Sequence, residues 1–370
     1  MRIIYVITDL SLGGAELQLY KIAQKLRKDS DVKVISLLSK GNLGDDLIKL
    51  GVELSVVNFR KKRFFFYNFF KLCNLILDFK PDVVHCWMYH ANLIGGIASK
   101  VSKVKKIIWS IHHNNPSNEF NSYSTILISK LGAFFSFFIP EKVICVSKDV
   151  LNTHVNFGYQ EKKMVCIPNG IDILEFSKID NARQLLLKKY NFADDVKLIG
   201  FPSRFHPVKN HEGFFASIAM IKRSNPNLDL QLILSGKNID SNNTELITLI
   251  NKYELTECVH LMGLLNDMPL FMSSIDLLVN YSYSEAFSLV LAEALACETL
   301  CISTIEGDPE HIIEGIGKYV TSGDDIGLSN TIINLLKMDI LKEIKKKGRE
   351  KIITLYSLNI VLKKYKSLYF

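Results

Sequence analysis

The sequence lacks three features that would each point to a class of protein. No apolar run is long enough to cross a membrane, and the apolar start from Ile3 to Ile7 is too short for a signal peptide. The seven cysteines contain no Cys-x-x-Cys pair, so we expect reduced thiols rather than a zinc site. No Gly-x-Gly-x-x-Gly fingerprint is present, which argues against a dinucleotide cofactor. These absences favour a cytoplasmic protein.

The charge of the chain is unevenly distributed. Residues 1–176 contain 23 Lys or Arg against 15 Asp or Glu, whereas residues 177–370 contain 22 against 23. Much of the basic excess lies beside aromatic residues, in Arg60–Lys71 and around Lys130 before Phe134–Phe138. Basic flanks with an aromatic body suit an anionic membrane surface, although two core helices with solvated lysines would give the same pattern. Nucleic acid is not an expected partner.

Short apolar runs alternate with helical stretches along both halves of the chain. The 370 residues suffice for two domains, and continuous apolar strands separated by helices predict a parallel sheet covered on both faces. The expected strands of the first half are Ile3–Thr8, Val32–Leu38, Val52–Asn58, Val83–Trp87, Lys106–Ile111, Lys142–Ser147 and Met164–Pro168. The pattern restarts with Val196–Ser203, Leu228–Ser235, Val259–Gly263, Ile275–Tyr281, Leu300–Ile305 and Lys318–Thr321. We therefore expect two doubly wound α/β domains whose ligands bind at the carboxyl ends of the strands.

Two carboxylates bracket an apolar helical segment late in the chain. Glu285 precedes the segment and Glu293 lies within it, by this reading about two turns inside the helix. The amides of Ser288, Leu289 and Val290 would form its first turn, which is an anion site suited to a diphosphate. A capping Glu followed by a surface Glu is the alternative.

Three further loops could carry chemistry. Gly13-Gly14 follows the first strand and lets the backbone approach a phosphate, unless it is only a helix cap. His112-His113-Asn114 offers hydrogen bonds after the fifth strand, with an exposed polar turn as the alternative. Arg204 and Lys209 could converge on one phosphate, unless both are surface cations. His85 is expected to be a satisfied strand histidine.

Taken in order, these motifs resemble those of glycosyltransferase family 4, a family of retaining enzymes with the two-domain GT-B fold. The resemblance spans nearly the whole chain, and its motifs are specific only in combination. It rests on Gly13-Gly14-Ala15-Glu16, Val83-Val84-His85, the His112 loop, Val146-Ser147-Lys148, Ile167–Asp172, Arg204-x4-Lys209-Asn210, Asp276–Val279 and Glu285-x7-Glu293.

The resemblance implies a fold and a domain layout. Two Rossmann-like domains would face each other across a cleft, and a final helix would cross back to the first domain. The acceptor-side domain would span residues 1–172 with 356–370, and the nucleotide-sugar domain would span residues 173–355.

The resemblance also assigns roles to residues. Arg204 and Lys209 would hold the donor diphosphate, Glu293 the ribose and Glu285 the transferred sugar, with His112 and Gly13-Gly14 closing from the first domain. Glu285, His112, Arg204 and Lys209 are the catalytic candidates. The remaining donor-binding candidates are Gly263, Leu264, Leu265, Ala286, Phe287, Ser288, Leu289 and Val290, and the acceptor-binding candidates are Glu16, His113 and Asn114. Ala286 and Glu298 depart from the family, which usually has Gly at both places.

We therefore expect a retaining, hexosyl-type glycosyltransferase. It would transfer a sugar from a nucleoside diphosphate sugar, with a UDP-sugar as the expected donor, to a glycan or lipid-linked acceptor for cell-surface polysaccharide. No metal or other cofactor is expected. The enzyme would lie at the inner face of the cytoplasmic membrane. A sugar-nucleotide epimerase and a catalytically silent glycan-binding protein are the alternatives.

Overall fold

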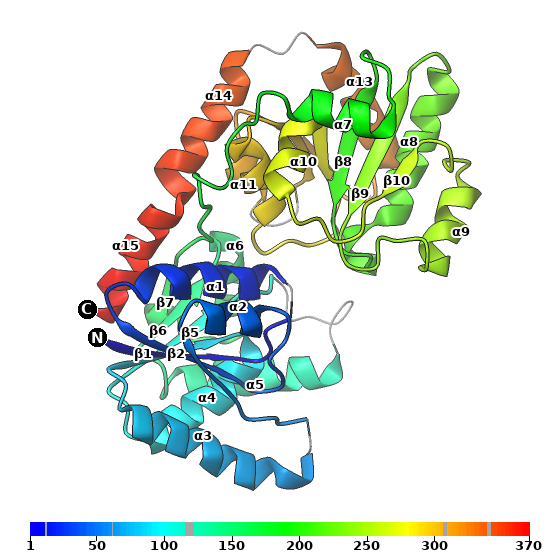
Figure 1. Ribbon diagram of the computed structural model, residues 1–370. Helices are drawn as coiled ribbons and strands as arrows, with labels where there is room; N and C mark the ends of the chain where they lie inside the picture. Colours follow the sequence, from blue (N-terminus) through cyan, green and yellow to red (C-terminus); the bar gives the residue numbers. More distant parts are fainter. Residues whose placement is uncertain (12, 61, 115–121, 306–308, 339–341) are drawn as a thin grey trace. The chain divides into compact units, whose positions relative to one another are not determined.

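The computed structural model describes residues 1–11, 13–60, 62–114, 122–305, 309–338 and 342–370, which form two compact units (Figure 1). Unit 1 comprises Met1–Gly170 and Val361–Phe370, and unit 2 comprises Ile171–Ile360. The sequence placed these borders at residues 172 and 356. Among the described residues, no helix combines the length and apolarity needed to span a bilayer.

Unit 1 is built on a seven-stranded, wholly parallel sheet of order β3-β2-β1-β4-β5-β6-β7. The strands are β1 Arg2–Ile7, β2 Asp31–Ser36, β3 Glu53–Val56, β4 Val83–Trp87, β5 Lys106–Ile111, β6 Lys142–Cys145 and β7 Met164–Cys166. The helices are α1 Gly14–Leu26, α2 Leu43–Lys49, α3 Phe65–Phe79, α4 Tyr89–Val101, α5 Tyr123–Ser136 and α6 Lys148–Asn156. Two 3-10 turns, η1 Lys62–Phe64 and η2 Glu161–Lys163, complete the unit.

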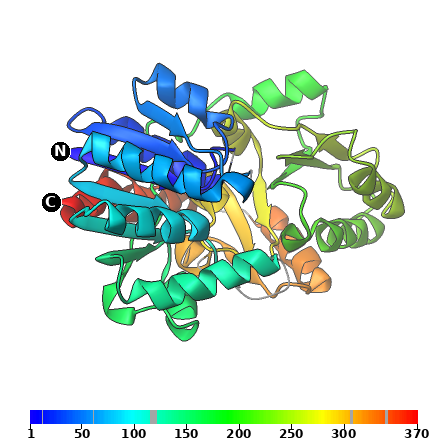
Figure 2. The same ribbon diagram turned by 90° about the horizontal axis from the view of Figure 1, so that it is seen from below.

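Alternation along β4 assigns helices to the two faces of this sheet. Helix α4 packs on one face, where a Cβ added to Gly95 would lie 2.9 Å from Cys86 Sγ. His85, the residue before Cys86 in β4, points to the opposite face of the sheet. Its side chain forms a hydrogen bond with Tyr369 of the last helix, α15 Leu358–Tyr369. Helix α4 also packs against α3 on one side and α5 on the other (Figure 2). The residues of α15 from Val361 onward thus cover the face opposite α3, α4 and α5.

Unit 2 repeats the architecture with a six-stranded parallel sheet of order β10-β9-β8-β11-β12-β13. Its strands are β8 Lys197–Pro202, β9 Leu230–Ser235, β10 Val259–Leu261, β11 Leu277–Asn280, β12 Leu300–Thr304 and β13 Lys318–Val320. Its helices are α7 Ala182–Tyr190, α8 His211–Ser224, α9 Thr244–Lys252, α10 Met268–Ser274, α11 Leu289–Ala296, α12 Pro309–Ile313, α13 Asp325–Lys337 and α14 Lys342–Lys351. A 3-10 turn, η3 Pro207–Lys209, precedes α8, and a π-helical turn, η4 Ile352–Tyr356, follows α14.

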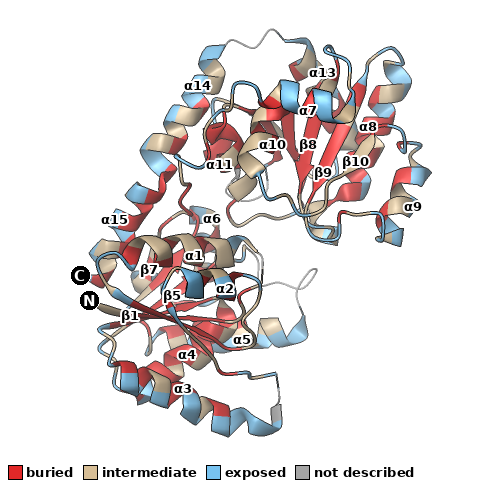
Figure 3. Cartoon of the chain, in the orientation of Figure 1, coloured by how far each residue is buried: buried red, intermediate tan, exposed pale blue. Residues whose placement is uncertain are grey.

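The central strands of both units are buried on both faces, as Figure 3 shows, whereas strands at the sheet edges such as β3 and β10 are partly exposed. Every residue of β4, β11 and β12 is buried, so these strands cannot present side chains to solvent along their length. The prediction of two doubly wound α/β domains is therefore confirmed, with strand ends within three residues of those expected. The chemistry of each unit must lie in the loops at its sheet edges.

Candidate functional site

Three loops meet at the carboxyl edge of the unit 2 sheet. The loop after β8 is joined to the loop after β9 by the Phe205 amide, which donates to the Lys237 carbonyl at 2.9 Å. Gly236, which follows β9, has φ of 144°, and a Cβ there would lie 2.4 Å from the Ser203 carbonyl oxygen. Its amide donates to the carbonyl of Gly263, after β10, at 2.7 Å. The glycine therefore permits a close backbone approach that brings the Arg204 loop and the Gly263 loop together.

Asn210 fixes the position of Lys209 at the start of α8. Asn210 adopts a left-handed conformation with φ of 50°, and its side chain accepts a hydrogen bond from the Gly213 amide at 3.1 Å. A Cβ on Gly213 would approach the Asn210 side chain to 2.7 Å, so a small residue is required beneath the cap. The chain before Asn210 is consequently held in one path, which carries Lys209 to the edge of the sheet.

Lys209 forms an ion pair with Glu285, which lies in the loop after β11. The two side chains are 20% and 12% exposed, respectively. The Ser282 hydroxyl donates to Glu285 Oε1 at 2.9 Å, and the Tyr283 amide donates to the Val208 carbonyl at 2.8 Å. The structure thus brings two of the predicted catalytic residues together. Arg204 lies exposed on the same loop as Lys209, so its convergence with Lys209 on a phosphate stays a prediction.

Helix α11 begins within one residue of the first turn that the sequence predicted, but Glu293 lies less deep in it than expected. Ser288 is the residue before the helix and Leu289 its first member, so Glu293 is the fifth residue of eight rather than two turns inside. The expected depth of Glu293 was therefore wrong. The loop before α11 is held by the bond from Ser282 to Glu285 and by the bond from Tyr283 to Val208 in the β8 loop.

The amino end of α11 combines free amides with an unpartnered hydroxyl. The Ser288 side chain is buried, and its hydroxyl has no hydrogen-bond partner among the described residues. The first amides of a helix also lack intrahelical partners and carry its positive dipole. Ala286, Leu289 and Val290 are half-buried beside it. This end of the helix can therefore bind an anion that accepts several hydrogen bonds.

The other unit 2 candidates lie close to this edge. Phe287 is buried, and its ring centroid lies 5.7 Å from that of Tyr356. Gly263 has φ of 60°, and the two leucines that follow it, Leu264 and Leu265, are exposed and half-buried. Glu293 is half-buried on α11. An apolar wall and two carboxylates thus accompany the cations.

In unit 1, Gly13 immediately precedes α1 and Gly14 is its first residue. Gly13 is extended, with φ of −159°, and a Cβ on it would lie 2.4 Å from Glu16 Oε2. A larger residue would displace the Glu16 carboxylate. Gly13 is therefore the helix cap, and the approach of this glycine pair to a phosphate stays a prediction.

His112 follows β5 at the same edge of unit 1. Its ring stacks on Trp87, with centroids 4.5 Å apart and planes at 17°. Both ring nitrogens are buried and have no hydrogen-bond partner among the described residues. Burial, with a smaller contribution from His113, lowers the pKa of His112 to about 3, so the imidazole is neutral at pH 7. A neutral ring with two unused polar atoms is suited to a ligand hydroxyl.

Two other unit 1 histidines have different surroundings. His113 stacks on Tyr89 with centroids 5.5 Å apart, and Asn114 is half-buried beyond it. His85 is hydrogen-bonded through both nitrogens, to Ser110 Oγ at 2.6 Å and to the Tyr369 hydroxyl at 2.7 Å. The prediction of a satisfied strand histidine is confirmed. Asn115 and Pro116 of the predicted polar loop lie outside the described residues.

Two residues of the site were not predicted from the sequence. Ser282 stands three positions before Glu285, in the Ser-x-x-Glu spacing typical of a capping box, and this signal could have revealed it. Trp87 carries the stacking surface for His112, and an aromatic residue at a strand's carboxyl end gave only a weak indication of that role.

Two family descriptions match successive parts of this chain. "Glycosyltransferase Family 4" matches residues 12–174 and "Glycosyl transferases group 1" matches residues 182–351. The chain belongs to glycosyltransferase family 4. The resemblance drawn from the sequence is confirmed, and this family 4 protein is a glycosyltransferase.

Named relatives of this glycosyltransferase are distant. An N,N'-diacetylbacillosaminyl-diphospho-undecaprenol alpha-1,3-N-acetylgalactosaminyltransferase of Campylobacter jejuni is 22% identical, over 97% of each chain. A UDP-Gal:alpha-D-GlcNAc-diphosphoundecaprenol alpha-1,3-galactosyltransferase of Escherichia coli is 23% identical, over 80% of this chain and 77% of that one. An N-acetyl-alpha-D-glucosaminyl L-malate synthase of Bacillus anthracis is 26% identical, but the match spans only 59% of its length.

Solved structures share the fold of this glycosyltransferase. Anabaena Alr3699/HepE in complex with UDP and glucose aligns with a TM-score of 0.86 and 20% identity over 99% of both chains. A glycosyltransferase from Rickettsia africae ESF-5 aligns with a TM-score of 0.84 and 22% identity, over 100% of this chain and 97% of that one. The predicted GT-B class is therefore confirmed at the level of the fold.

Histidines whose rings are buried in the neutral form make the free energy of unfolding decrease as the pH is lowered. Burial also lowers the pKa of His211, in unit 2, to about 3. The pKa of each histidine is lower in the folded state than in the unfolded state. Its contribution to the free energy of unfolding is therefore complete above about pH 6.5 and is lost as the pH falls towards 3. At pH 5 the loss is about 2 kcal/mol per histidine. We expect His112→Gln and His211→Gln each to flatten the fall in unfolding free energy between about pH 7.5 and pH 5, measured by urea unfolding. The exposed His311→Gln is the control, and a slope unchanged in both variants would contradict the assignment.

Proposed function

We propose that this protein transfers a sugar from a UDP-sugar to a lipid-linked glycan acceptor, with retention of the anomeric configuration, in the synthesis of a cell-surface polysaccharide. The observation that carries the proposal is the Lys209–Glu285 ion pair beside the amino end of α11 and its buried, unpartnered Ser288 hydroxyl. A cation, helix amides and a carboxylate along one sheet edge match a diphosphate joined to a sugar.

The donor binds to unit 2 in this proposal. The Ser288 hydroxyl and the first amides of α11 take the diphosphate oxygens, and Lys209 and Arg204 neutralise its charge. Glu285, held by Ser282, accepts a hydrogen bond from a hydroxyl of the transferred sugar, and Glu293 accepts from the ribose. The backbone of Gly263-Leu264-Leu265 contacts the nucleotide base of the donor. The relative complexed with UDP and glucose supports this class of donor.

The reaction needs one bond made and one broken. The acceptor hydroxyl oxygen attacks the anomeric carbon from the face that the diphosphate leaves, and the bond from that carbon to the diphosphate oxygen breaks. The hydroxyl proton passes to the departing phosphate. Lys209, Arg204 and the α11 amides stabilise the charge that develops on that group, so the protein supplies this role without a metal.

The acceptor binds to unit 1 in this proposal. The neutral His112 ring accepts or donates one hydrogen bond to an acceptor hydroxyl, and His113, Asn114 and Glu16 line the approach. Undecaprenol-linked acceptors in the names of two relatives support a lipid-linked substrate. In this proposal the enzyme acts on that substrate at the inner face of the cytoplasmic membrane.

The donor assignment is tested by thermal shift with UDP-, GDP- and ADP-sugars. We expect a UDP-sugar to raise the melting temperature most, because a ligand at about 100 times its Kd stabilises the folded state by about 2.7 kcal/mol. Arg204→Ala and Glu293→Gln should reduce the shift. Arg223→Ala, an exposed arginine of α8, is the matched control. A shift with no nucleotide sugar would overturn the donor proposal.

The ion pair is tested by its removal. We expect Lys209→Met and Glu285→Gln each to lower kcat by on the order of 100-fold, because each removes a group that stabilises or orients the reacting donor. Lys252→Met breaks an exposed pair with Glu212 in the same unit and should leave kcat unchanged. Equal losses in all three variants would indicate a general structural effect instead.

Chemical outcome and metal requirement are tested together. We expect the anomeric configuration of the donor in the product, as measured by NMR, and an unchanged rate after treatment with a chelator. An inverted product would refute retention. Loss of activity that Mg²⁺ or Mn²⁺ restores would refute metal-free transfer, and free epimerised donor without acceptor would favour an epimerase.

A further inference from the structure

Unit 1 exposes two apolar stripes on the helices that cover one face of its sheet. On α3, Phe66, Phe70 and Leu77 are each half exposed or more, and on α5 the same holds for Tyr123, Leu127 and Phe134. Both sets have the spacing i, i+4, i+11, which places each triplet on one side of its helix. Scattered exposed apolar residues are ordinary, but two ordered stripes of this kind mark an interaction surface.

The charge around these stripes is mainly positive, with the exposed Asp78 beside Leu77 as the acidic exception. Residues 60–71 contain five Lys or Arg and no Asp or Glu, and residues 123–138 contain one Lys and no acidic residue. Arg63 lies over the Phe64 ring with its guanidinium carbon 4.7 Å from the ring centroid. Lys71 and Lys130 are exposed on α3 and α5. Protein interfaces are depleted in lysine, whereas an anionic lipid surface attracts cations set among aromatic rings.

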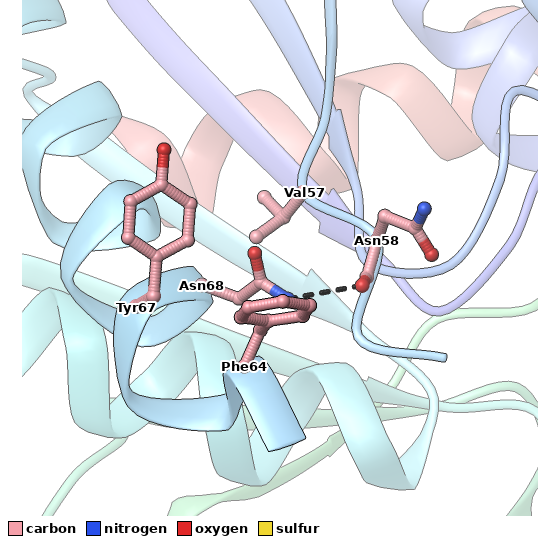
Figure 4. A pocket seen from close by; sticks show the side chains of 5 residues that line it. All are labelled: Val57, Asn58, Phe64, Tyr67 and Asn68. Carbon is pink, nitrogen blue, oxygen red and sulfur yellow. Dashed lines mark hydrogen bonds between the residues drawn. The ribbon is translucent and has the colours of Figure 1, made fainter. Parts of the chain in front are cut away.

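A hollow of about 380 Å³ opens where α3 begins. Figure 4 shows its lining, Val57, Asn58, Phe64, Tyr67 and Asn68. The Asn68 amide donates to the Asn58 carbonyl at 3.0 Å, which ties the start of α3 to the chain that leaves β3. Because a helix that follows a parallel strand starts at the carboxyl edge of the sheet, the hollow lies at the same edge of unit 1 as Gly13 and His112.

We infer that the outer sides of α3 and α5 dock on an anionic lipid bilayer. The aromatic and leucine side chains settle at headgroup depth, Arg63, Lys71 and Lys130 contact lipid phosphates, and bilayer lipid fills the hollow beside Phe64 and Tyr67. The inference rests on the proposed function only in that a lipid-linked acceptor is presented from such a surface. What it adds to that function is the surface that contacts the bilayer, namely the face of unit 1 that carries α3 and α5.

The test is co-sedimentation of the full chain with vesicles of phosphatidylglycerol and phosphatidylcholine, and with vesicles of phosphatidylcholine alone, without donor or acceptor. We expect binding to the anionic vesicles that weakens with added salt. Phe66→Ser with Phe70→Ser should abolish it. Arg63→Gln with Lys71→Gln and Lys130→Gln should weaken it on the order of 100-fold, at about fivefold per cation.

Matched controls lie in unit 2. Leu174 and Ile326 are exposed apolar residues there, and Lys188, Lys189 and Arg223 are exposed cations. The corresponding Ser and Gln variants should bind vesicles as the unaltered chain does. Equal binding by the unit 1 and unit 2 variants would overturn the assignment of the surface. The assignment would also be overturned if sedimentation velocity showed a dimer that Phe70→Ser dissociates. The surface would then bind a second copy of this chain instead of lipid.

Activity on a water-soluble acceptor analogue separates this inference from the proposed function. The unit 1 surface variants should retain that activity while losing vesicle binding. If the unaltered chain transfers sugar but does not bind vesicles, the docking inference fails and the function stands. If it binds vesicles but transfers no sugar, the function fails and the docking surface stands.

Discussion

The burial of both faces of each parallel sheet is the constraint on which the rest of the structure depends. Strands such as β4, β11 and β12 have no exposed residue, and their backbone groups are paired with neighbouring strands. Polar side chains that must reach a ligand can therefore gather only where the strands end. In unit 2 this places the cations, the carboxylates and the amino end of α11 in the loops of one edge, although they are far apart in sequence.

Within that edge, preorganisation comes from the loops rather than from the charged groups themselves. A half-buried ion pair gains little net stability, because desolvation offsets much of its attraction. Lys209 and Glu285 are instead positioned by neutral groups: Asn210 caps α8, Ser282 bonds the carboxylate, and Tyr283 joins the two loops. The charges are thereby fixed before a ligand binds, which is the condition for electrostatic stabilisation of a leaving group.

The sequence could predict what depends on local patterns. Continuous apolar runs identified all thirteen strands found among the described residues, and strand-to-helix turns identified the loops that carry Gly13, His112, Arg204 and Glu285. It could not predict the Lys209–Glu285 pair, because these residues are 76 positions apart and their contact depends on sheet order. The depth of Glu293 in α11 was overestimated because all eight positions from Glu285 were counted as helix, whereas the helix begins only at Leu289.

The C-terminal helix limits where unit 1 can meet a surface. Tyr369 of α15 bonds both Tyr5 and His85, and Tyr365 packs against the rings of His85 and Trp87, so one face of the sheet is occupied by the chain's own end. The opposite face carries α3, α4 and α5, and in the part of the chain that the structure describes no such helix covers the exposed apolar stripes of α3 and α5. Because Trp87 also supports His112, the helix that closes one face backs the proposed acceptor site. We therefore propose that lipid anchorage uses the face that carries α3 and α5, and that the acceptor binds at the carboxyl edge of the same sheet, beside Trp87.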